Sequence, residues 1–259
     1  MRPDSPQIIE SKSNPWFKQL RQTVQDNAHY KASGLIWVEG DQLVQAALQQ
    51  GMQPEWVVLS PAVEASGALS WMGNWPVKVL AQPLFDQISA LPAASQVAGL
   101  FRRPAPQPLS AQAPTVVLDR IQDVGNVGSI LRSAAAFGFQ QIIALKGTAA
   151  LWGPKALRAG MGAHFALDLH EDVDASGLVE LKDLPRLATS SHGGQVLLKS
   201  GINLPWPCAW FLGNEGQGLA PELAASCRIQ VRIDQPGGQE SLNVAAAAAI
   251  CLFVSSLSH

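Results

Sequence analysis

The sequence predicts an α/β protein of two domains, and three observations support this prediction. Short apolar runs alternate with helix-like segments along the chain, which is typical of a mostly parallel sheet covered by helices. A proline-rich stretch at residues 102–114 interrupts the alternation. The chain has 259 residues, 47% of them hydrophobic and 15% charged, so it can bury a sizeable core.

Residues 1–103 read as the smaller α/β domain. Asn14 can cap a helix that runs to about Asn27, because Pro15 suits a first turn and Trp16, Leu20 and Val24 recur at helical spacing. The remaining expected elements are strands at 35–38, 56–59, 77–80 and 96–101 and a helix at 41–50, with further helices after the second and third strands.

The proline-rich stretch reads as a linker over residues 104–114. Its four prolines disfavour helix and internal strand and favour an extended chain. Residues 115–259 then form the second domain. Its expected strands are 115–118, 141–145, 209–212 and 229–233, and its expected helices are 129–137, 154–161, 221–226 and 242–257. Ligands of such sheets bind beyond the carboxyl ends of the strands.

Composition excludes several classes of protein. The formal net charge is −2, which is not the basic footprint of a general nucleic-acid coat protein, so any RNA binding must use local patches. Three widely spaced cysteines without C-x-x-C, and five histidines without ligand spacing, predict neither a disulfide framework nor a metal site. The N-terminus lacks a signal peptide and the longest apolar run, 244–254, is too short for a bilayer, so we expect a soluble cytoplasmic protein that does not bind membranes.

Three glycine-bearing loops are the candidate chemical sites. The first, DRIQDVGNVG at 119–128, precedes a helix on which Arg132 can reach back toward the loop. It lacks the Gly-Lys-Ser/Thr of a phosphate-binding Walker A loop. It also fails the G-x-G-x-x-G spacing, which argues against a dehydrogenase. Taken alone, it also fits a plain turn with a surface arginine.

The other two loops follow later strands. LGNEGQGL at 212–219 has three glycines and one charge, Glu215, and its exposed backbone can cradle a flat ring or an anion. GGQESLN at 237–243 opens the apolar C-terminal helix, which Ser241 or Asn243 can cap. Each of these loops alone also fits a glycine-rich turn or a helix cap.

Together, the three loops resemble the motifs of the SpoU (TrmH-type) branch of the SPOUT RNA methyltransferases. The matching segments are N-x-G-x-x-x-R at 126–132, LGNEGQGL and ESLNVAAAAAICLF at 240–253, in the family's order over residues 115–257. Val124 departs from the proline usual there, which affects the rigidity of the turn more than the chemistry. The N-terminal part resembles the family's ribosomal-protein-like substrate-binding domain through Ser13-Asn14-Pro15 with Lys18, and through Val38-Glu39-Gly40.

The resemblance implies a fold and an activity. The C-terminal domain is then a trefoil-knotted methyltransferase domain that binds S-adenosylmethionine (AdoMet) in the knot, in a homodimer with active sites at the subunit interface. The implied reaction is methylation of a ribose 2′-hydroxyl, with ribosomal RNA favoured over transfer RNA by analogy. The alternatives are the same reaction on transfer RNA, or a non-catalytic RNA-binding protein that keeps the fold.

The resemblance also assigns site residues. The catalytic positions are Asn126, Arg132, Glu215, Ser241 and Asn243, and the cofactor-binding positions are Gly213, Gly218, Ile233 and Leu242. No metal is implied. The residues proposed to guide RNA are all basic: Lys12, Lys18, Arg21, Arg102 and Arg103.

Arg132 is the family's usual candidate for the proton acceptor, but its chemistry argues for another role. An arginine pKa lies above about 12, and lowering it to near 7 costs roughly 7 kcal/mol. We therefore expect Arg132 to grip the phosphate beside the target ribose bidentately, and this phosphate to relay the proton.

Overall fold

The computed structural model describes residues 8–67, 69–89, 95–190, 193–197, 204–237 and 241–258. The chain forms two compact units, each with its own sheet. The first unit comprises Met1–Ala105 and Trp152–Arg158, and the second comprises Pro106–Leu151 and Ala159–His259. The division at Ala105 falls within the stretch interpreted as a linker, where residues 103–114 form neither helix nor strand.

The first unit contains a five-stranded mixed sheet in the order β1-β4-β3-β5-β2. Strands β1, β4 and β3 run parallel, while β5 runs antiparallel to both β3 and β2. Their bounds are Ile8–Ile9 (β1), Leu35–Glu39 (β2), Pro54–Leu59 (β3), Val77–Leu80 (β4) and Val97–Arg102 (β5). Four of the five strands were predicted, and the two-residue β1 was too short to show a pattern.

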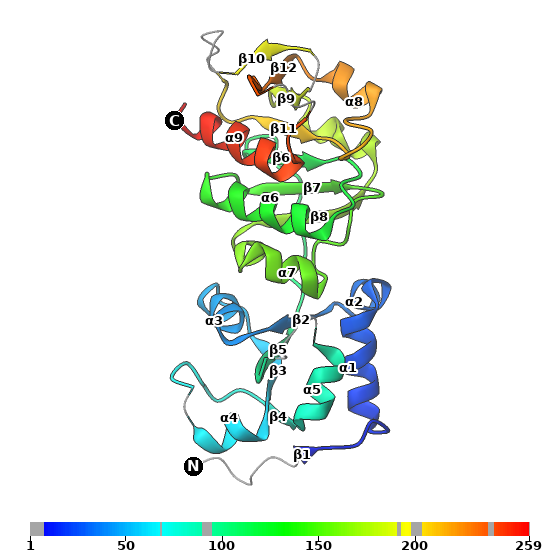
Figure 1. Ribbon diagram of the computed structural model, residues 1–259, viewed down its shortest axis with the longest axis vertical. Helices are drawn as coiled ribbons and strands as arrows, with labels where there is room; N and C mark the ends of the chain where they lie inside the picture. The colour runs from blue at the N-terminus through cyan, green and yellow to red at the C-terminus, as the bar shows by residue number, and fades with distance from the viewer. Residues whose placement is uncertain are drawn as a thin grey trace. The chain divides into compact units, whose positions relative to one another are not determined.

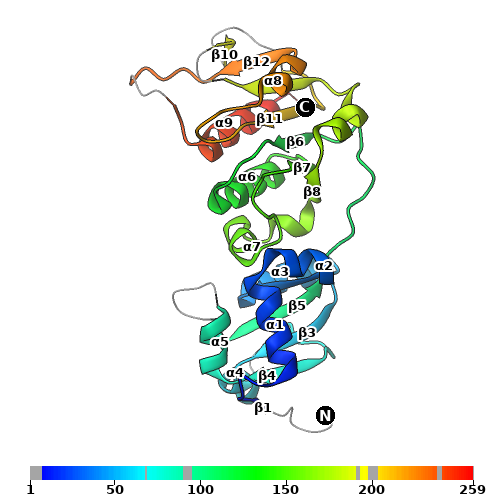
Figure 2. The same ribbon diagram turned by 90° about the vertical axis from the view of Figure 1, so that its right-hand side faces the viewer.

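Helices cover both faces of this sheet. Helices α1 (Pro15–Gln25) and α5 (Gln82–Ile88) lie side by side and pack their apolar residues on one face (Figures 1 and 2). On the other face, Val63 of α4 (Pro61–Ser66) contacts Val57 and its buried neighbours. The remaining helices are α2 (Asn27–Ser33) and α3 (Asp41–Gln49). Asn14 caps α1 as predicted, since its side chain accepts from the Trp16 and Phe17 N–H groups.

The second unit contains a seven-stranded sheet whose described strand pairs are all parallel. Its order is β10-β12-β9-β11-β6-β7-β8, which Figure 1 shows from top to bottom. The bounds are Thr115–Leu118 (β6), Gln141–Leu145 (β7), Asp168–Val173 (β8), Arg186–Thr189 (β9), Gln195–Val196 (β10), Ala209–Leu212 (β11) and Ile229–Arg232 (β12).

Helices pack against both faces of the parallel sheet, as the fold class requires. Helices α6 (Val124–Ala136) and α9 (Val244–Ser256) lie side by side, and the buried Trp210 indole of β11 donates to Ser255 of α9 at 2.8 Å (Figure 1). The next residue, Phe211, points to the opposite face and packs with the 3-10 segment η2 (Ala175–Leu181) and α8 (Pro221–Ser226). The 3-10 segment η1 is Ala163–Ala166, and helix α7 is Pro154–Gly160, most of which belongs to the first unit.

Two sequence interpretations need correction here. Helix α6 begins at Val124, so much of the first predicted loop is its first turn; Asp123 caps it by accepting the Asn126 N–H at 2.7 Å. Strands β8, β9 and β10 were missed, because they are short or carry polar residues and do not form apolar runs. Within the described part of the chain, no helix is long and apolar enough to cross a membrane.

Candidate cofactor pocket and active site

The candidate site lies at the carboxyl edge of the parallel sheet. Strands β12, β9, β11 and β6 are neighbours and run parallel, so their carboxyl ends meet at one edge. The first and second loops leave this edge after β6 and β11, and the segment from Ile233 onward leaves it after β12. This is the edge at which ligands of open α/β sheets bind.

The second and third loops enclose a cavity of about 600 Å³. All four predicted cofactor-binding residues line it, together with three of the five predicted catalytic residues: Gly213, Gly218, Ile233, Leu242, Glu215, Ser241 and Asn243. Residues 238–240 of the third motif lie outside the described residues. The second and third loops that the sequence singled out therefore share one pocket, while no residue of the first loop lines it.

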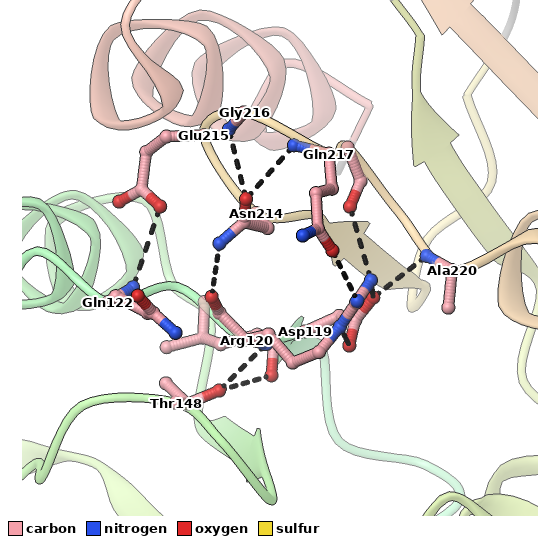
Figure 3. Close-up of polar contacts among 11 residues, drawn as sticks. Asp119, Arg120, Gln122, Thr148, Asn214, Glu215, Gly216, Gln217 and Ala220 are labelled. Carbon is pink, nitrogen blue, oxygen red and sulfur yellow. Dashed lines mark hydrogen bonds and ion pairs between the residues drawn. The ribbon is translucent and has the colours of Figure 1, made fainter.

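Asn214 folds the second loop into a closed cradle. Its side-chain oxygen accepts the Gly216 and Gln217 N–H groups at 3.0 Å each, while its amide nitrogen donates to the Arg120 carbonyl at 2.8 Å (Figure 3). The backbones of Asn214 and Gly218 also exchange two hydrogen bonds, of 3.1 and 2.8 Å. The loop conformation is thus fixed by internal bonds before any ligand binds.

Gly213 has to be glycine for this cradle to close. A Cβ at that position would stand 2.1 Å from the Leu219 nitrogen and 2.3 Å from the Gly218 carbonyl carbon, and backbone atoms cannot yield as a flexible side chain does. Gly218 has a φ of +69°, a left-handed conformation that glycine adopts without strain.

An ion pair between Asp119 and Arg120, directly after β6, supports the cradle formed by the second loop. Arg120 donates from Nε to Asp119 Oδ1 at 2.9 Å and from Nη2 to Asp119 Oδ2 at 3.0 Å. Its Nη1 donates to Gln217 Oε1 at 2.9 Å, and Asp119 Oδ2 also accepts the Ala220 N–H at 2.8 Å (Figure 3). The hydrogen bond and charge of the nearly buried Asp119 raise the Arg120 pKa. This pair therefore joins the start of the first loop to the C-terminal end of the second.

Arg120 adopts a φ of +55°, which is uncommon for a residue with a side chain. Its N–H donates to Thr148 Oγ1 at 3.1 Å, and its carbonyl accepts from Asn214. These two bonds and the side-chain contacts hold the strained conformation, which costs on the order of 1 kcal/mol.

Three predicted catalytic residues form one chain of hydrogen bonds. Asn243 Oδ1 accepts the Ala245 and Ala246 N–H groups and so caps α9, which leaves its Nδ2 as the donor to Asn126 Oδ1 at 3.0 Å. Asn126 Nδ2 in turn donates to Glu215 Oε1 at 3.0 Å. This order of donors and acceptors fixes the orientation of both amides.

Glu215 is held as a carboxylate. Burial raises its pKa, but hydrogen bonds from the Asn126 side chain and from backbone N–H groups outweigh this, and the pKa falls below its ordinary value. The Gln122 and Asp123 N–H groups donate to it at 3.5 and 3.4 Å. A negative charge thus stands at the N-terminal end of α6, where the helix dipole favours it.

Arg132 lies apart from this network. It is exposed on α6, does not line the cavity, and has no hydrogen-bond or ion-pair partner among the residues that the structure describes. Six residues separate it from Asn126, which places the two side chains about 120° apart around the helix. The expected reach of Arg132 back to its own loop is therefore not present in this structure. Ser241 is exposed at the mouth of the cavity.

The cavity has the features of a site for a flat, partly polar molecule. Its walls combine apolar side chains, among them Leu219, Val231 and Leu242, with the glycine backbone of the cradle. Gln235 also lines it, and its buried Oε1 finds no hydrogen-bond partner among the described residues. A buried acceptor without a partner is costly, so it fits a ligand that brings a donor. These residues match a ring system with an amino group, as AdoMet has.

The described residues offer no group of side chains suited to a metal ion. Among residues 8–67, 69–89, 95–190, 193–197, 204–237 and 241–258, no three His, Cys, Asp or Glu side chains are grouped to hold an ion. The three cysteines are buried, and burial raises the Cys208 and Cys251 pKa values to about 12 and the Cys227 pKa to about 11, so their thiols stay protonated.

Sequence reasoning missed four residues of the site: Asp119, Arg120, Asn214 and Gln235. A signal was present for the first three, since they stand one or two positions after the apolar runs that end at Leu118 and Leu212. Gln235 follows β12 in a stretch without a motif, and only the fold brings it to the cavity.

A parallel sheet with glycine cradles at its carboxyl edge defines an α/β enzyme of the type that binds a nucleotide-like molecule. The particular family follows from comparison. Residues 113–253 match the model of the SpoU rRNA Methylase family, and the chain belongs to this family.

Similar proteins match this chain over most of its length. An uncharacterized tRNA/rRNA methyltransferase of Synechocystis is 31% identical over 95% of this chain and 92% of the relative. The 23S rRNA (guanosine(2553)-2'-O)-methyltransferase RlmP of Bacillus subtilis is 27% identical over 95% of this chain and 97% of its own. A crystal structure of an AdoMet-bound rRNA methyltransferase from Sinorhizobium meliloti superposes with a TM-score of 0.81 at 28% identity, covering 96% and 97% of the two chains.

Proposed function

We propose that this chain transfers the methyl group of AdoMet to the 2′-hydroxyl of a ribose in ribosomal RNA. The observation that carries the proposal is the cavity, which is lined by the glycine cradle, by Glu215 and Asn243, and by a Gln235 oxygen without a partner among the described residues. Asn126 joins Glu215 to Asn243 through two hydrogen bonds. The names of relatives that methylate a ribose 2′-oxygen, and the AdoMet held by a similar structure, support it.

The cradle and the apolar walls would hold the cofactor. Gly213 and Gly218 offer backbone atoms at close approach, and Ile233 and Leu242 offer apolar contact to a ring. AdoMet supplies a methyl group activated by a sulfonium. The chain must then exclude water and align the ribose oxygen with that methyl group, and such alignment is worth effective molarities of about 10⁵–10⁸ M.

Asn126, Glu215, Ser241 and Asn243 would position the ribose and the loops. Arg132 would hold the phosphate next to the target ribose through its two-pronged guanidinium. A phosphate oxygen then accepts the hydroxyl proton as the oxygen–carbon bond forms and the carbon–sulfur bond breaks. This route leaves the guanidinium protonated throughout, as the chemistry of arginine requires.

The exposed position of Arg132 fits a homodimer in which one protomer's arginine serves the cavity of its partner. Helix α9 presents an apolar face: Ile250, Phe253 and Leu257 are 36%, 48% and 66% exposed. Burial of such a face is favourable at about 25 cal/mol per Å². The ring of Phe253 also packs on Phe137, the C-cap residue of α6, 5.6 Å between centroids, so the face continues to the end of the helix that carries Arg132.

Three further expectations belong to the same proposal. Residues 1–103 would be the RNA-binding domain, with basic residues such as Lys18 and Arg102 guiding the strand, and its affinity would fall steeply with salt. The second domain would thread as a trefoil knot, which the order of strands alone does not define. A cytoplasmic location stays a prediction from the sequence.

Three experiments test the proposal. Isothermal calorimetry should show one AdoMet bound per chain, which a non-catalytic RNA-binding protein would not need; absence of binding would contradict the proposal. A phosphorothioate beside the target ribose should slow methyl transfer, and an unchanged rate would rule out the phosphate relay. Arg132→Lys tests the proposed bidentate contact with the phosphate, because lysine keeps the positive charge but lacks the planar guanidinium.

A further inference from the structure

A small hollow in the first unit lies apart from the residues already assigned. It measures about 180 Å³ and lies between α1 and the sheet, lined by Trp16 and Leu20 of the helix and by Leu35, Trp56 and Leu100 of three strands. This volume is below the roughly 300–1,000 Å³ of sites for drug-sized ligands, so it suits a single ring system.

Two tryptophans form its aromatic wall. The rings of Trp16 and Trp56 lie 6.5 Å apart at 79°, an edge-to-face arrangement, and both side chains are only partly buried. Trp56 stands directly opposite Leu100 in the β3–β5 pair, on the face that elsewhere packs against α1 and α5. The apolar layer therefore ends in two partly exposed aromatic rings.

Cations stand beside these rings. Lys78 Nζ lies 4.3 Å from the centroid of Trp56 and 5.9 Å from that of Trp16, and no carboxylate pairs with it among the described residues. Arg102, two residues after Leu100 and so on the same face, has a side chain 67% exposed. It pairs with Glu55, which sits where the register of β3 with β5 shifts. One cation thus lies at the aromatic rings, and the carboxylate of Glu55, which lines the hollow, carries a second cation.

We propose that this hollow binds one unpaired base of the substrate RNA, with Lys78 and Arg102 attracting the adjacent phosphates. Aromatic rings beside cations are the combination that holds single-stranded nucleic acid, because every base has a stacking face and every linkage a charge. The polar side chains of Gln19 and Glu55 also line the hollow and can meet the edge of a base. The inference rests on the proposed function for its RNA, and it adds a contact that reads unstacked nucleotides.

The test compares two labelled strands of equal charge, an adenosine dodecamer and a dodecamer of abasic linkages, by fluorescence anisotropy. The wild-type chain should bind the adenosine strand more tightly. Trp56→Ala should weaken that binding about tenfold, while Trp56→Phe should stay within about twofold, since it keeps a ring. Trp75→Ala is the matched control, because Trp75 packs in the cluster on the opposite face of the same sheet.

Equal affinity of the wild type for both strands would overturn the inference, as would an unchanged Trp56→Ala variant. Thermal unfolding should show that Trp56→Phe folds like the wild type, so this variant keeps the test valid if the alanine variant unfolds. AdoMet binding, measured by calorimetry, should be the same in all variants. Loss of AdoMet binding in the wild type would instead contradict the proposed function and leave the strand comparison standing.

Discussion

The Nδ2 of Asn243 donates to Oδ1 of Asn126 at 3.0 Å and joins two residues 117 positions apart in the chain. Asn243 is the cap of α9, and Asn126 lies in the first turn of α6. Because Asn126 also bonds Glu215, one amide connects the starts of both helices to the second loop. The Asn126 side chain thus holds three parts of the candidate site together.

Asn126→Ala removes both bonds at once. We expect kcat to fall about 10- to 100-fold, because misplacement of about 1 Å can have an effect of that size. The free energy of unfolding should change little, since the side chain is only partly buried. Steady-state kinetics and thermal unfolding check this. Ser129→Ala, exposed on the same helix, is the control. A mutant with wild-type kcat would remove Asn126 from the proposed site.

Gly213→Ala should abolish AdoMet binding, because the added Cβ would overlap the Leu219 nitrogen and open the cradle. Calorimetry measures the affinity, and circular dichroism reports whether the fold is kept. Gly237→Ala is the matched control, since a Cβ there meets nothing within 4 Å. Normal affinity in Gly213→Ala would show that the cradle is not part of the binding site.

Arg120→Gly separates backbone strain from side-chain support. Glycine relieves the strain at φ +55°, so the variant should fold, but it loses the bonds to Asp119 and Gln217. Three bonds of about 1 kcal/mol each are lost, and the relieved strain of about 1 kcal/mol offsets part of this. We therefore expect the KM for AdoMet to rise about 30-fold, with a smaller change in kcat. Arg120→Lys should recover part of the affinity. A KM equal to that of the wild type in Arg120→Gly would contradict this positioning role.

His164 predicts a pH-dependent stability. Burial lowers its pKa from 6.5 to about 4, against the smaller opposite effect of its bond to the Leu151 carbonyl. The unfolded chain therefore binds this proton more readily, so the contribution of His164 is constant above pH 6.5 and is lost as the pH falls from 6.5 toward 4. The loss amounts to about 3 kcal/mol over the full window.

Urea unfolding between pH 4 and 7 measures this effect, with His164→Gln as the comparison. The variant starts from lower stability because it changes a fully buried side chain. Its stability should then fall less steeply with acid than that of the wild type. Parallel pH curves for the two proteins would contradict the assignment.

The sequence predicted the architecture best where apolar runs were strong. Buried strands such as Val116–Leu118 and Trp210–Leu212 carry continuous apolar side chains, and these were placed correctly. The edge strand β8 carries Asp168, His170 and Asp172, so it gave no apolar run and was missed. The start of α6 was misplaced because Gly125 and Gly128 suggested a loop, whereas the Asp123 cap holds a helix there.

The loops of the candidate site could be read from the sequence, but their connections could not. Glycine spacing indicates the cradle, but nothing in the sequence predicts the hydrogen bond between Arg120 and Gln217, since these residues are 97 positions apart. The bond between Asn126 and Asn243 likewise depends on α6 and α9 packing side by side. The Trp16–Trp56 pair needs the register of α1 on its sheet, which sequence periodicity does not define.

Mapping of the methylated nucleotide decides whether this chain methylates a ribose 2′-oxygen in ribosomal RNA. Ribosomal RNA is incubated with the chain and with AdoMet labelled in its methyl group. The labelled nucleotide is then located in the RNA, and digestion to nucleosides shows whether the label is on the ribose or on the base. We expect the labelled methyl group on the 2′-oxygen of a single ribose, and we expect no label when the Arg132→Ala variant is used. Label on a base, or none despite measured AdoMet binding, would contradict this expectation.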